Sequence, residues 1–363
     1  MKYFLISIGV LLGGVAIALG IGVSRSSLEP LAWTPPEPPS LTGILEENTR
    51  LQDADWLELA GWYGPEDIAV DAQGNIYAGV HDGNFENGAI LKLTPDGEVS
   101  VFSDTGSWVT GLHIDAAGNL IACDQARGLI SVDQAGNITT LATHDEYGRP
   151  LLLPNDVDIA SDGMIYFSNS TSTLTFSLTS ARQIIMEQKP VGGLYRYDPN
   201  TQTVTTLIEG GYFSNGVAVS ADDSFVLLVD TGRYQIRRHW LTGERAGQTE
   251  MFMENLPGFA NGISRRADGS FWLGFSTRRN AAMDTIHPHP WLKKLVFSLP
   301  MWLQPEQERY GIILNISATG EVIDAYFDPT GNRVPETSSV TEYDGTLLIG
   351  GDLTQQISRY SLE

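Results

Sequence analysis

Cysteine is almost absent from this sequence: the 363-residue chain holds a single one, Cys123. One thiol excludes an internal disulfide, a Cys-x-x-Cys redox motif and a multi-cysteine zinc site. Basic residues are also scarce, with 22 Lys and Arg against 44 Asp and Glu and a formal net charge of −22. A surface this acidic repels phosphate backbones, so nucleic acid is not an expected partner.

Motifs of several enzyme classes are missing as well. The sequence has no Gly-x-Ser-x-Gly nucleophile elbow, no Gly-x4-Gly-Lys phosphate loop and no His-Glu-x-x-His zinc helix. What it does have is a hydrophobic share of 42% that includes 13 Phe, 13 Tyr and 8 Trp. That is enough apolar surface for a sizeable folded core, which excludes global disorder.

A run of 21 uncharged residues, Tyr3 to Val23, follows Lys2. As a helix rising about 1.5 Å per residue it would be ~31 Å long, enough to cross a hydrocarbon core of ~30 Å. We therefore expect a single-pass transmembrane signal anchor at residues 1–24, with the rest of the chain outside the cytosol. A signal cleaved at Ala16-Ile17-Ala18 and a buried helix are the alternatives.

Prolines mark the segment that follows, with five between Pro30 and Pro39. Such a composition favours extended polyproline geometry, so residues 25–50 are predicted to form a semi-rigid linker. The remaining residues, 51–363, form the predicted globular domain.

Within this domain, short strand-like runs alternate with Asp/Gly turns that recur at a regular interval. The turn residues are 44, 45, 60, 46 and 76 positions apart, at Gly74, Gly118, Gly163, Asp223, Gly269 and Gly345. A period near 45 is typical of one four-stranded propeller blade, so the sequence predicts an all-β fold, a six-bladed β-propeller. We expect Trp56–Leu59 to pair with Ile357–Leu362 and close the ring. The two long intervals indicate insertions at about 169–193 and 276–310, both on one face.

The position eight residues before each repeat turn should form a ring, because the first strand of every blade lines the central channel. The six residues there are Glu66, Thr110, Asn155, Asn215, Asn261 and Thr337. Hard oxygen donors at Glu66, Asn155, Asn215 and Asn261 suit one Ca²⁺ ion in the channel. The alternative is that the Asn residues cap turns, since Asn-Gly at 215–216 and 261–262 is a turn dipeptide.

Where the second strands return to that face, the repeat places a second polar belt. It consists of His81, Asp82, Asp124, Asn169, Asp230, Ser276 and Asp352. Carboxylates near a metal act as general bases, and Asp124 and Glu66 are the predicted catalytic residues. His81 and Asp230 are predicted to bind substrate, although an ion pair with Arg233 or Arg237 is the alternative for Asp230.

One basic and aromatic stretch, Trp291–Trp302, interrupts the acidic domain. It is interpreted either as a lid helix packed over the propeller or as an interfacial helix that contacts the membrane or admits apolar substrates.

Several motifs resemble those of the strictosidine synthase-related propellers, in particular members with an N-terminal anchor. They include Gly64-Pro-Glu66, Gly192-Gly-Leu-Tyr-Arg-Tyr-Asp198, Phe213-Ser-Asn-Gly-Val-Ala-Val-Ser220 and Ser339-Val-Thr-Glu-Tyr-Asp-Gly345. The resemblance runs from about residue 55 to the C-terminus and extends distantly to paraoxonases and gluconolactonases, which are calcium-dependent hydrolases. It implies that Glu66, Asn155, Asn215 and Asn261 are calcium ligands.

Two departures from that family limit the activity it implies. Asn261 stands where an Asp is common, and Ser338 stands where strictosidine synthase carries its catalytic glutamate. The expected function is a membrane-anchored, calcium-dependent hydrolase of small apolar esters or lactones. The alternative is a non-catalytic binding propeller at the membrane, and a carbon–nitrogen bond-forming synthase comes third.

Overall fold

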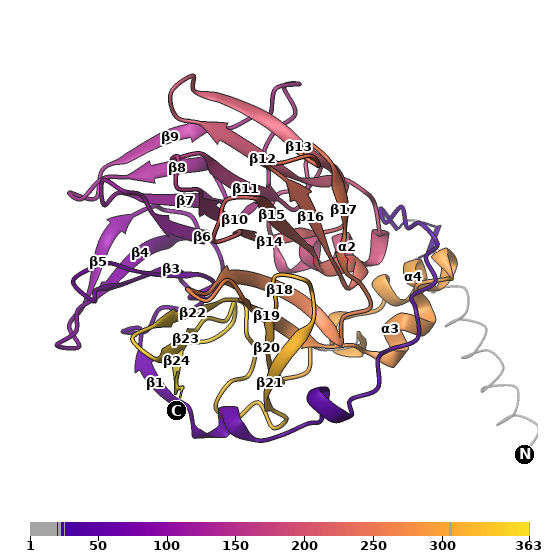
Figure 1. Ribbon diagram of the computed structural model, residues 1–363. Coiled ribbons are helices and arrows are strands. Elements are labelled where there is room, and N and C mark those ends of the chain that lie inside the picture. Colours follow the sequence, from indigo (N-terminus) through magenta and orange to yellow (C-terminus); the bar gives the residue numbers. More distant parts are fainter. Residues whose placement is uncertain (1–19, 21–22, 25, 305–306, 363) are drawn as a thin grey trace, which may run out of the picture.

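The computed structural model describes residues 20, 23–24, 26–304 and 307–362. The chain folds into six four-stranded antiparallel sheets arranged around a central axis (Figure 1). This confirms the predicted six-bladed β-propeller. The predicted anchor at residues 1–24 lies almost wholly outside the described residues, and among those described no helix is long and apolar enough to span a bilayer.

Every blade starts with its innermost strand, and the blades follow one another along the chain. The first three blades are β2 (Ile68–Val70), β3 (Ile76–His81), β4 (Gly88–Leu93) and β5 (Val99–Asp104); β6 (Val109–Ile114), β7 (Leu120–Asp124), β8 (Gly128–Val132) and β9 (Ile138–Ala142); and β10 (Pro154–Ile159), β11 (Ile165–Asn169), β12 (Gly192–Asp198) and β13 (Thr203–Gly211). The last three are β14 (Ser214–Val219), β15 (Phe225–Asp230), β16 (Gln235–Trp240) and β17 (Thr249–Met253); β18 (Gly258–Arg265), β19 (Phe271–Arg278), β20 (Gly311–Ile316) and β21 (Val322–Asp328); and β22 (Val340–Tyr343), β23 (Thr346–Ile349), β24 (Gln356–Ser361) and β1 (Asp55–Glu58).

The ring closes as predicted, because the N-terminal strand β1 supplies the outer strand of the last blade. Asp55 lies opposite Arg359 and Trp56 opposite Ser358 in the β1–β24 ladder. An ion pair of 2.6 Å between Arg359 and Asp55 joins the two strands. Closure gives the innermost strand β2 a neighbour on both sides, β6 and β22.

The repeated turns have a simple chemical basis, seen in the first blade. The Asp71 carboxylate accepts hydrogen bonds from the backbone N–H groups of Gln73 (2.9 Å) and Asn75 (2.8 Å). Gly74 adopts the left-handed conformation, with φ +81°, that glycine tolerates without steric cost. Asp115 and Gly118 repeat this arrangement in the second blade, and the other blades carry Asp-Gly or, at 222–223, Asp-Asp at the same point, so counting these turns located the blades.

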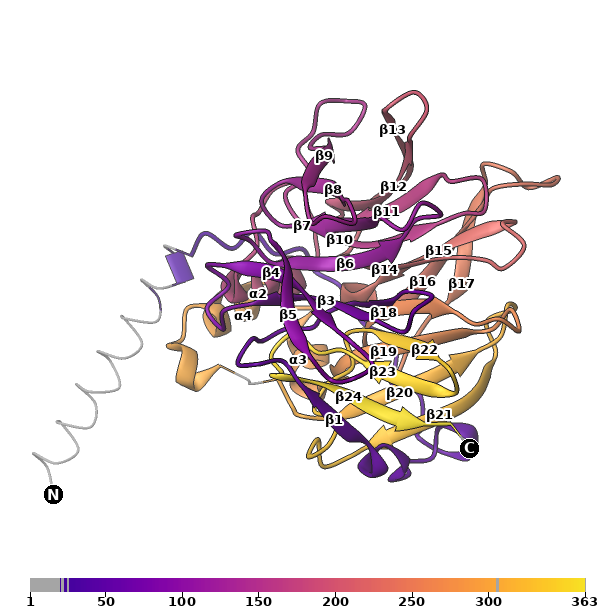
Figure 2. The same cartoon turned by 90° about the vertical axis from the view of Figure 1, so that its left-hand side faces the viewer.

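Both insertions form helices on one face of the propeller, as predicted. They contain α2 (Leu178–Glu187), α3 (Ala281–Ile286), α4 (Pro290–Phe297) and the short 3₁₀ helix η4 (Met301–Leu303). We call these four elements the helical cap. Both views place α2, α3 and α4 together at one side of the molecule (Figure 2).

The proline-rich segment is not a free-standing spacer, which corrects the prediction made from its composition. Residues 28–39, here called the strap, are bound along the propeller and its cap. Leu31 N–H donates to the carbonyl of Glu187 (2.8 Å), and Trp33 N–H donates to that of His287 (3.1 Å). Past the strap, the chain forms the 3₁₀ helices η1 (Gly43–Leu45) and η2 (Arg50–Asp53) and then enters β1.

Candidate functional site at the central channel

Two cavities enter the propeller along its axis from opposite faces, and one ring of side chains lines both of them. The cavity on the cap side has a volume of about 450 Å³, and the opposite one about 320 Å³. The shared ring consists of Glu66, Thr110, Asn155, Asn215 and Asn261. The structure thus brings together the four predicted metal ligands. Thr337, the sixth ring position expected from the repeat, lines neither cavity, and its hydroxyl donates to the carbonyl of Phe275 (3.0 Å).

A β-bulge flanks four of the five ring residues; Glu66, which precedes β2, is the exception. The pairing of β10 with β11 shifts register between Pro154 and Val157, on either side of Asn155. Equivalent shifts flank Thr110 in β6, Asn215 in β14 and Asn261 in β18. A bulge adds one residue to a strand and redirects the side chains around it, which is how these polar groups reach the axis.

The glycines that follow ring residues serve close packing between blades, and the Asn-Gly pairs at 215–216 and 261–262 lie inside strands β14 and β18. A Cβ atom on Gly216 would stand 2.5 Å from the carbonyl oxygen of Asn261, and one on Gly262 would stand 2.4 Å from that of Ser338. These dipeptides therefore do not form turns, so the turn-capping alternative does not account for the asparagines.

Among the described residues that line the cap-side cavity, four buried acceptor oxygens have no hydrogen-bond partner: Glu66 Oε2, Gln125 Oε1, Asn261 Oδ1 and Asp352 Oδ1. The Asn261 amide nitrogen donates to Ser276 Oγ (2.8 Å), an arrangement that leaves its oxygen free. Unpaired acceptors are costly in a protein interior unless a cation or an ordered water satisfies them. The donor set fits a hard, oxygen-preferring ion such as Ca²⁺. In the described part of the chain no three His, Cys, Asp or Glu side chains cluster as metal ligands, so amide oxygens would have to take part.

The electrostatics of the ring also favour a cation. Burial raises the pKa of Glu66 well above its usual range, and the neighbouring carboxyl of Asp352 adds to the effect. Burial raises the pKa of Asp352 well above its usual range too, with Glu336 as the next cause. Negative charge is thus disfavoured on these carboxyls when they face only one another, and a bound cation would reverse that preference.

Two further acids, both half-buried, adjoin the ring, and sequence reasoning missed them. Asp67 accepts a hydrogen bond from Leu112 N–H (2.8 Å), and Asp156 accepts one from Val217 N–H (2.6 Å). Each carboxylate therefore bridges the inner strands of successive blades. Burial raises the pKa of Asp67 to about 7 and that of Asp156 well above its usual range. Both residues directly follow a ring position, which is the signal that could have identified them.

Aromatic and aliphatic side chains wall the cap-side cavity above the ring. Phe85 and Phe213 line it from backbone conformations with φ of 61° and 59°. A bulky residue rarely adopts this left-handed conformation, and such strain is typical of functional sites. The Phe85 ring packs against Trp108 at 5.0 Å and against Phe176 at 5.0 Å, and both of these line the cavity as well.

His81, a predicted substrate-binding residue, lies behind this wall. Its ring stacks on Phe85 with 3.8 Å between centroids. Nδ1 accepts from Gly83 N–H (3.0 Å), so Nε2 carries the proton and donates to the carbonyl of Asp352 (2.8 Å). Burial lowers the pKa of the imidazole. His81 thus supports Phe85 and Asp352 and does not line the cavity.

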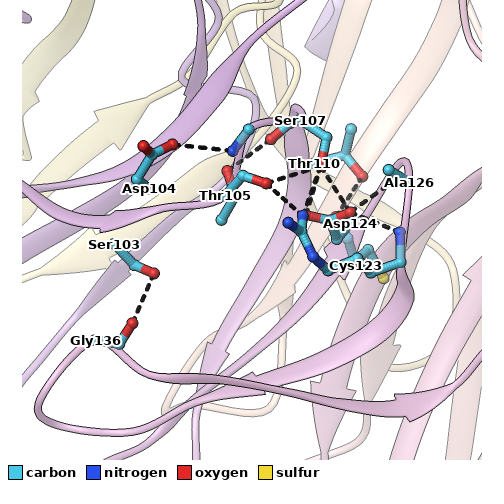
Figure 3. A network of polar contacts seen from close by, with 11 residues as sticks. Ser103, Asp104, Thr105, Ser107, Thr110, Cys123, Asp124, Ala126 and Gly136 are labelled. Atoms are coloured by element: carbon cyan, nitrogen blue, oxygen red, sulfur yellow. Dashed lines mark hydrogen bonds and ion pairs between the residues drawn. The ribbon is translucent and has the colours of Figure 1, made fainter.

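The other two predicted residues are occupied elsewhere. Asp124 accepts hydrogen bonds from the Ser107 hydroxyl (2.8 Å) and from the N–H groups of Ala126 (2.9 Å) and Arg127 (2.7 Å), as Figure 3 shows in part. Asp230 forms an ion pair with Arg237 at 2.7 Å, which confirms the alternative interpretation of that residue. Neither carboxylate lines a cavity of the channel. Asp352, another member of the predicted polar belt, is the belt carboxylate that does line the cap-side cavity.

Comparison with known proteins extends over nearly the whole chain. Residues 155–244 match the family described as strictosidine synthase, and residues 43–85 match strictosidine synthase-like, N-terminal. The adipocyte plasma membrane-associated protein of Rattus norvegicus is 30% identical, over 93% of this chain and 94% of its own length. Protein STRICTOSIDINE SYNTHASE-LIKE 3 of Arabidopsis thaliana is 30% identical, over 89% and 90% respectively. Among solved structures, a gluconolactonase of Xanthomonas campestris shares the fold with a TM-score of 0.61 and 19% identity. The match covers 93% of this chain and 99% of the gluconolactonase chain.

Proposed function

Because this chain belongs to the family of adipocyte plasma membrane-associated and strictosidine synthase-like proteins, we propose that it is a membrane-anchored, calcium-dependent hydrolase of small apolar esters or lactones. The family resemblance inferred from its motifs is confirmed by these relatives. One observation carries the proposal: unpaired acceptor oxygens of Glu66, Asn261 and Asp352 stand on a cavity that is also walled by aromatic side chains. The shared fold with a gluconolactonase supports the choice of lactones as one substrate class.

In this proposal Glu66, Asn155, Asn215 and Asn261 hold one Ca²⁺ ion in the central channel. A bound calcium ion supplies Lewis acidity toward a carbonyl oxygen. The walls formed by Phe85, Trp108 and their neighbours exclude water and hold the apolar part of the substrate. Aryl and acyl-chain esters fit such walls better than sugars do.

Asp352 takes the role of general base. It lies on the cavity with one carboxylate oxygen unpaired, and its raised pKa brings it nearer to the value that proton transfer at neutral pH requires. In hydrolysis it accepts the proton of the attacking water and returns it to the leaving alkoxide as the acyl carbon–oxygen bond breaks. Of the two residues predicted to be catalytic, Glu66 serves in this proposal as a calcium ligand at the polar end of the site, and Asp124 has no part in the scheme.

Membrane anchoring is the second element of the proposal. The uncharged run from Tyr3 to Val23 supports a single-pass anchor at residues 1–24 with the propeller outside the cytosol. The family supports it as well, since relatives carry the name plasma membrane-associated.

A non-catalytic binding propeller is the second candidate, and Asn261 favours it. With an amide at this position, Glu66 is the only charged member of the ring. A synthase of the strictosidine type is disfavoured by Ser338, whose hydroxyl donates to the backbone carbonyl of Glu66 (2.9 Å).

The test is hydrolysis of a panel of aryl esters, acyl esters and lactones by the full-length chain in detergent, with calcium and with a chelator. We expect calcium-dependent turnover, and a fall in kcat of about 10²-fold or more in Asp352→Asn. The control is Asp82→Asn. Asp82 is a belt carboxylate of the first blade that does not line the cavity, so this variant should leave kcat unchanged. Calcium binding without turnover on any substrate, also in Asn261→Asp, would instead support the binding propeller.

A further inference from the structure

The helical cap exposes large apolar side chains on its outer side. Trp291 of α4 is 63% exposed, and Trp302 and Leu303 of η4 are 77% and 50% exposed. The opposite side of α4 is buried, because Leu292 and Val296 pack against the cluster formed by Leu28, Met186 and Ile286. Leu178 of α2, also in the cap, is 48% exposed, whereas Val101 in β5 and Met251 in β17 are examples on the blades. Exposed apolar side chains gathered on neighbouring elements are typical of an interaction surface.

The chain enters the structure at the cap. Leu28 is fully buried there, only five residues after Val23, where the uncharged run ends. Five residues span at most about 18 Å, even when fully extended. Val23, where the uncharged run ends, therefore lies within that distance of Leu28, and Figure 2 shows the start of the described chain on the same side as α2 and α4.

The charge of the cap also differs from that of the whole molecule. Helix α4 carries Lys293 and Lys294 and no carboxylate, in a chain with a net charge of −22. Lys293 is buried and donates to the carbonyl of Leu31 (2.7 Å), which fixes α4 against the strap. Lys294 is partly exposed, and tryptophan, leucine and one such lysine together on a short helical segment suit the interface between lipid headgroups and acyl chains.

The same elements surround the mouth of the cap-side cavity. Leu178 and Met186 of α2, Met283 of α3 and Phe297 of α4 line it, and so does Gln304, which directly follows η4. A surface that covers the cap would therefore also cover the entrance to the candidate active site.

We propose that the helical cap is a membrane-docking surface, on which Trp291, Trp302 and Leu303 insert at the interface of the bilayer that holds the N-terminal segment. The cavity then opens toward that interface, and apolar esters reach it from the lipid phase. This inference rests on the anchoring part of the proposed function, and it does not depend on calcium or on turnover.

The test labels an introduced cysteine. The native Cys123 does not compete for the label, because it is fully buried and burial raises the pKa of its thiol. Trp291→Cys and Trp302→Cys each carry an environment-sensitive dye on the full-length chain, reconstituted in phosphatidylcholine vesicles. Tyr343→Cys is the matched control, because Tyr343 is 41% exposed and lines the cavity of the opposite face. Quenching by lipids with spin labels on the acyl chain is measured after flotation.

We expect lipid quenching of both cap labels at least threefold stronger than that of the Tyr343 label, with thermal unfolding of the three variants unchanged. Equal quenching on vesicles that carry the protein would overturn docking and leave anchoring intact. A chain that does not float with the vesicles would overturn both. Cap labels shielded from aqueous iodide but not quenched by lipid would indicate contact between copies of the chain and would also contradict the proposal.

Discussion

At the scale of single residues, the candidate site shows backbone strain where aromatic side chains meet the cavity. Phe85 holds φ at 61° and keeps its ring against His81, Trp108 and Phe176. A left-handed conformation costs a bulky residue roughly 1–2 kcal/mol, and each aromatic contact returns about 0.5–1.5 kcal/mol. Three such contacts return about 1.5–4.5 kcal/mol, which offsets the strain. In the proposed function, contact with substrate explains why the ring is held at the cavity wall.

Phe85→Gly tests that explanation. Relief of the strain should offset only part of the loss of three ring contacts, so the free energy of unfolding should fall by at most about 3.5 kcal/mol. The loss of a cavity wall should raise KM for an aryl ester about tenfold, with kcat nearly unchanged, as expected when binding contacts alone are removed. Asp344→Gly relieves a similar strain, with φ of 47°, at an exposed turn and should leave KM unchanged. An unaltered KM in Phe85→Gly would show that the ring does not touch substrate.

At the scale of elements, the strap is the part of the fold that composition describes least well. Its prolines correctly indicate extended geometry. The hydrogen bonds that hold it, however, are accepted or donated by backbone groups, which every residue has and which a sequence pattern therefore does not reveal. Arg279 is the clearest case: its guanidinium donates to the carbonyl of Pro36 (2.6 Å) and pairs with Asp284 (2.9 Å). The insertions, by contrast, were predictable because they lengthen a regular interval.

Two adjacent arginines allow a controlled test of the strap. Arg279→Ala removes one partner of a buried ion pair, since the Arg279 side chain is only 3% exposed, and should lower the free energy of unfolding by about 3–5 kcal/mol. Arg278→Ala breaks a half-exposed pair with Glu308 and should cost at most about 1 kcal/mol. Denaturant unfolding gives both values, and limited proteolysis should cut residues 28–39 faster in Arg279→Ala only. Equal losses in the two variants would mean that the strap contributes nothing to stability.

At the scale of the whole molecule, the repeat explains what was predictable. Glu66, Asn155, Asn215 and Asn261 could be found by counting, because each blade repeats the same strand, bulge and turn. Asp352 could not be singled out, because its approach to Glu66 joins the last blade to the first and arises only when the ring closes. Asp124 and Asp230 occupy equivalent belt positions, but local partners hold their carboxylates, and those partners depend on side-chain packing that a repeat count does not contain.

The closed ring also concentrates acids that retain protons in the folded state. Glu66, Asp156 and Asp352 have raised pKa values, and that of Asp67 is about 7. Between the ordinary carboxyl pKa near 4 and these folded values, the folded chain binds more protons than the unfolded chain. Stability without a divalent cation should therefore be highest near pH 5 and fall as the pH rises to 8.

The most direct test is thermal unfolding of the full-length chain at pH 5 and pH 8, with a chelator and with 1 mM calcium (roughly 10–100 times the Kd of a moderately tight calcium site). With the chelator, we expect Tm to be about 5–10 °C lower at pH 8 than at pH 5. Calcium should restore most of that loss at pH 8 and have little effect at pH 5. Glu66→Gln should abolish the calcium response, and Asp82→Asn should keep it. A Tm at pH 8 that calcium does not change in the wild-type chain would contradict the proposed cation site, and with it the calcium-dependent hydrolase.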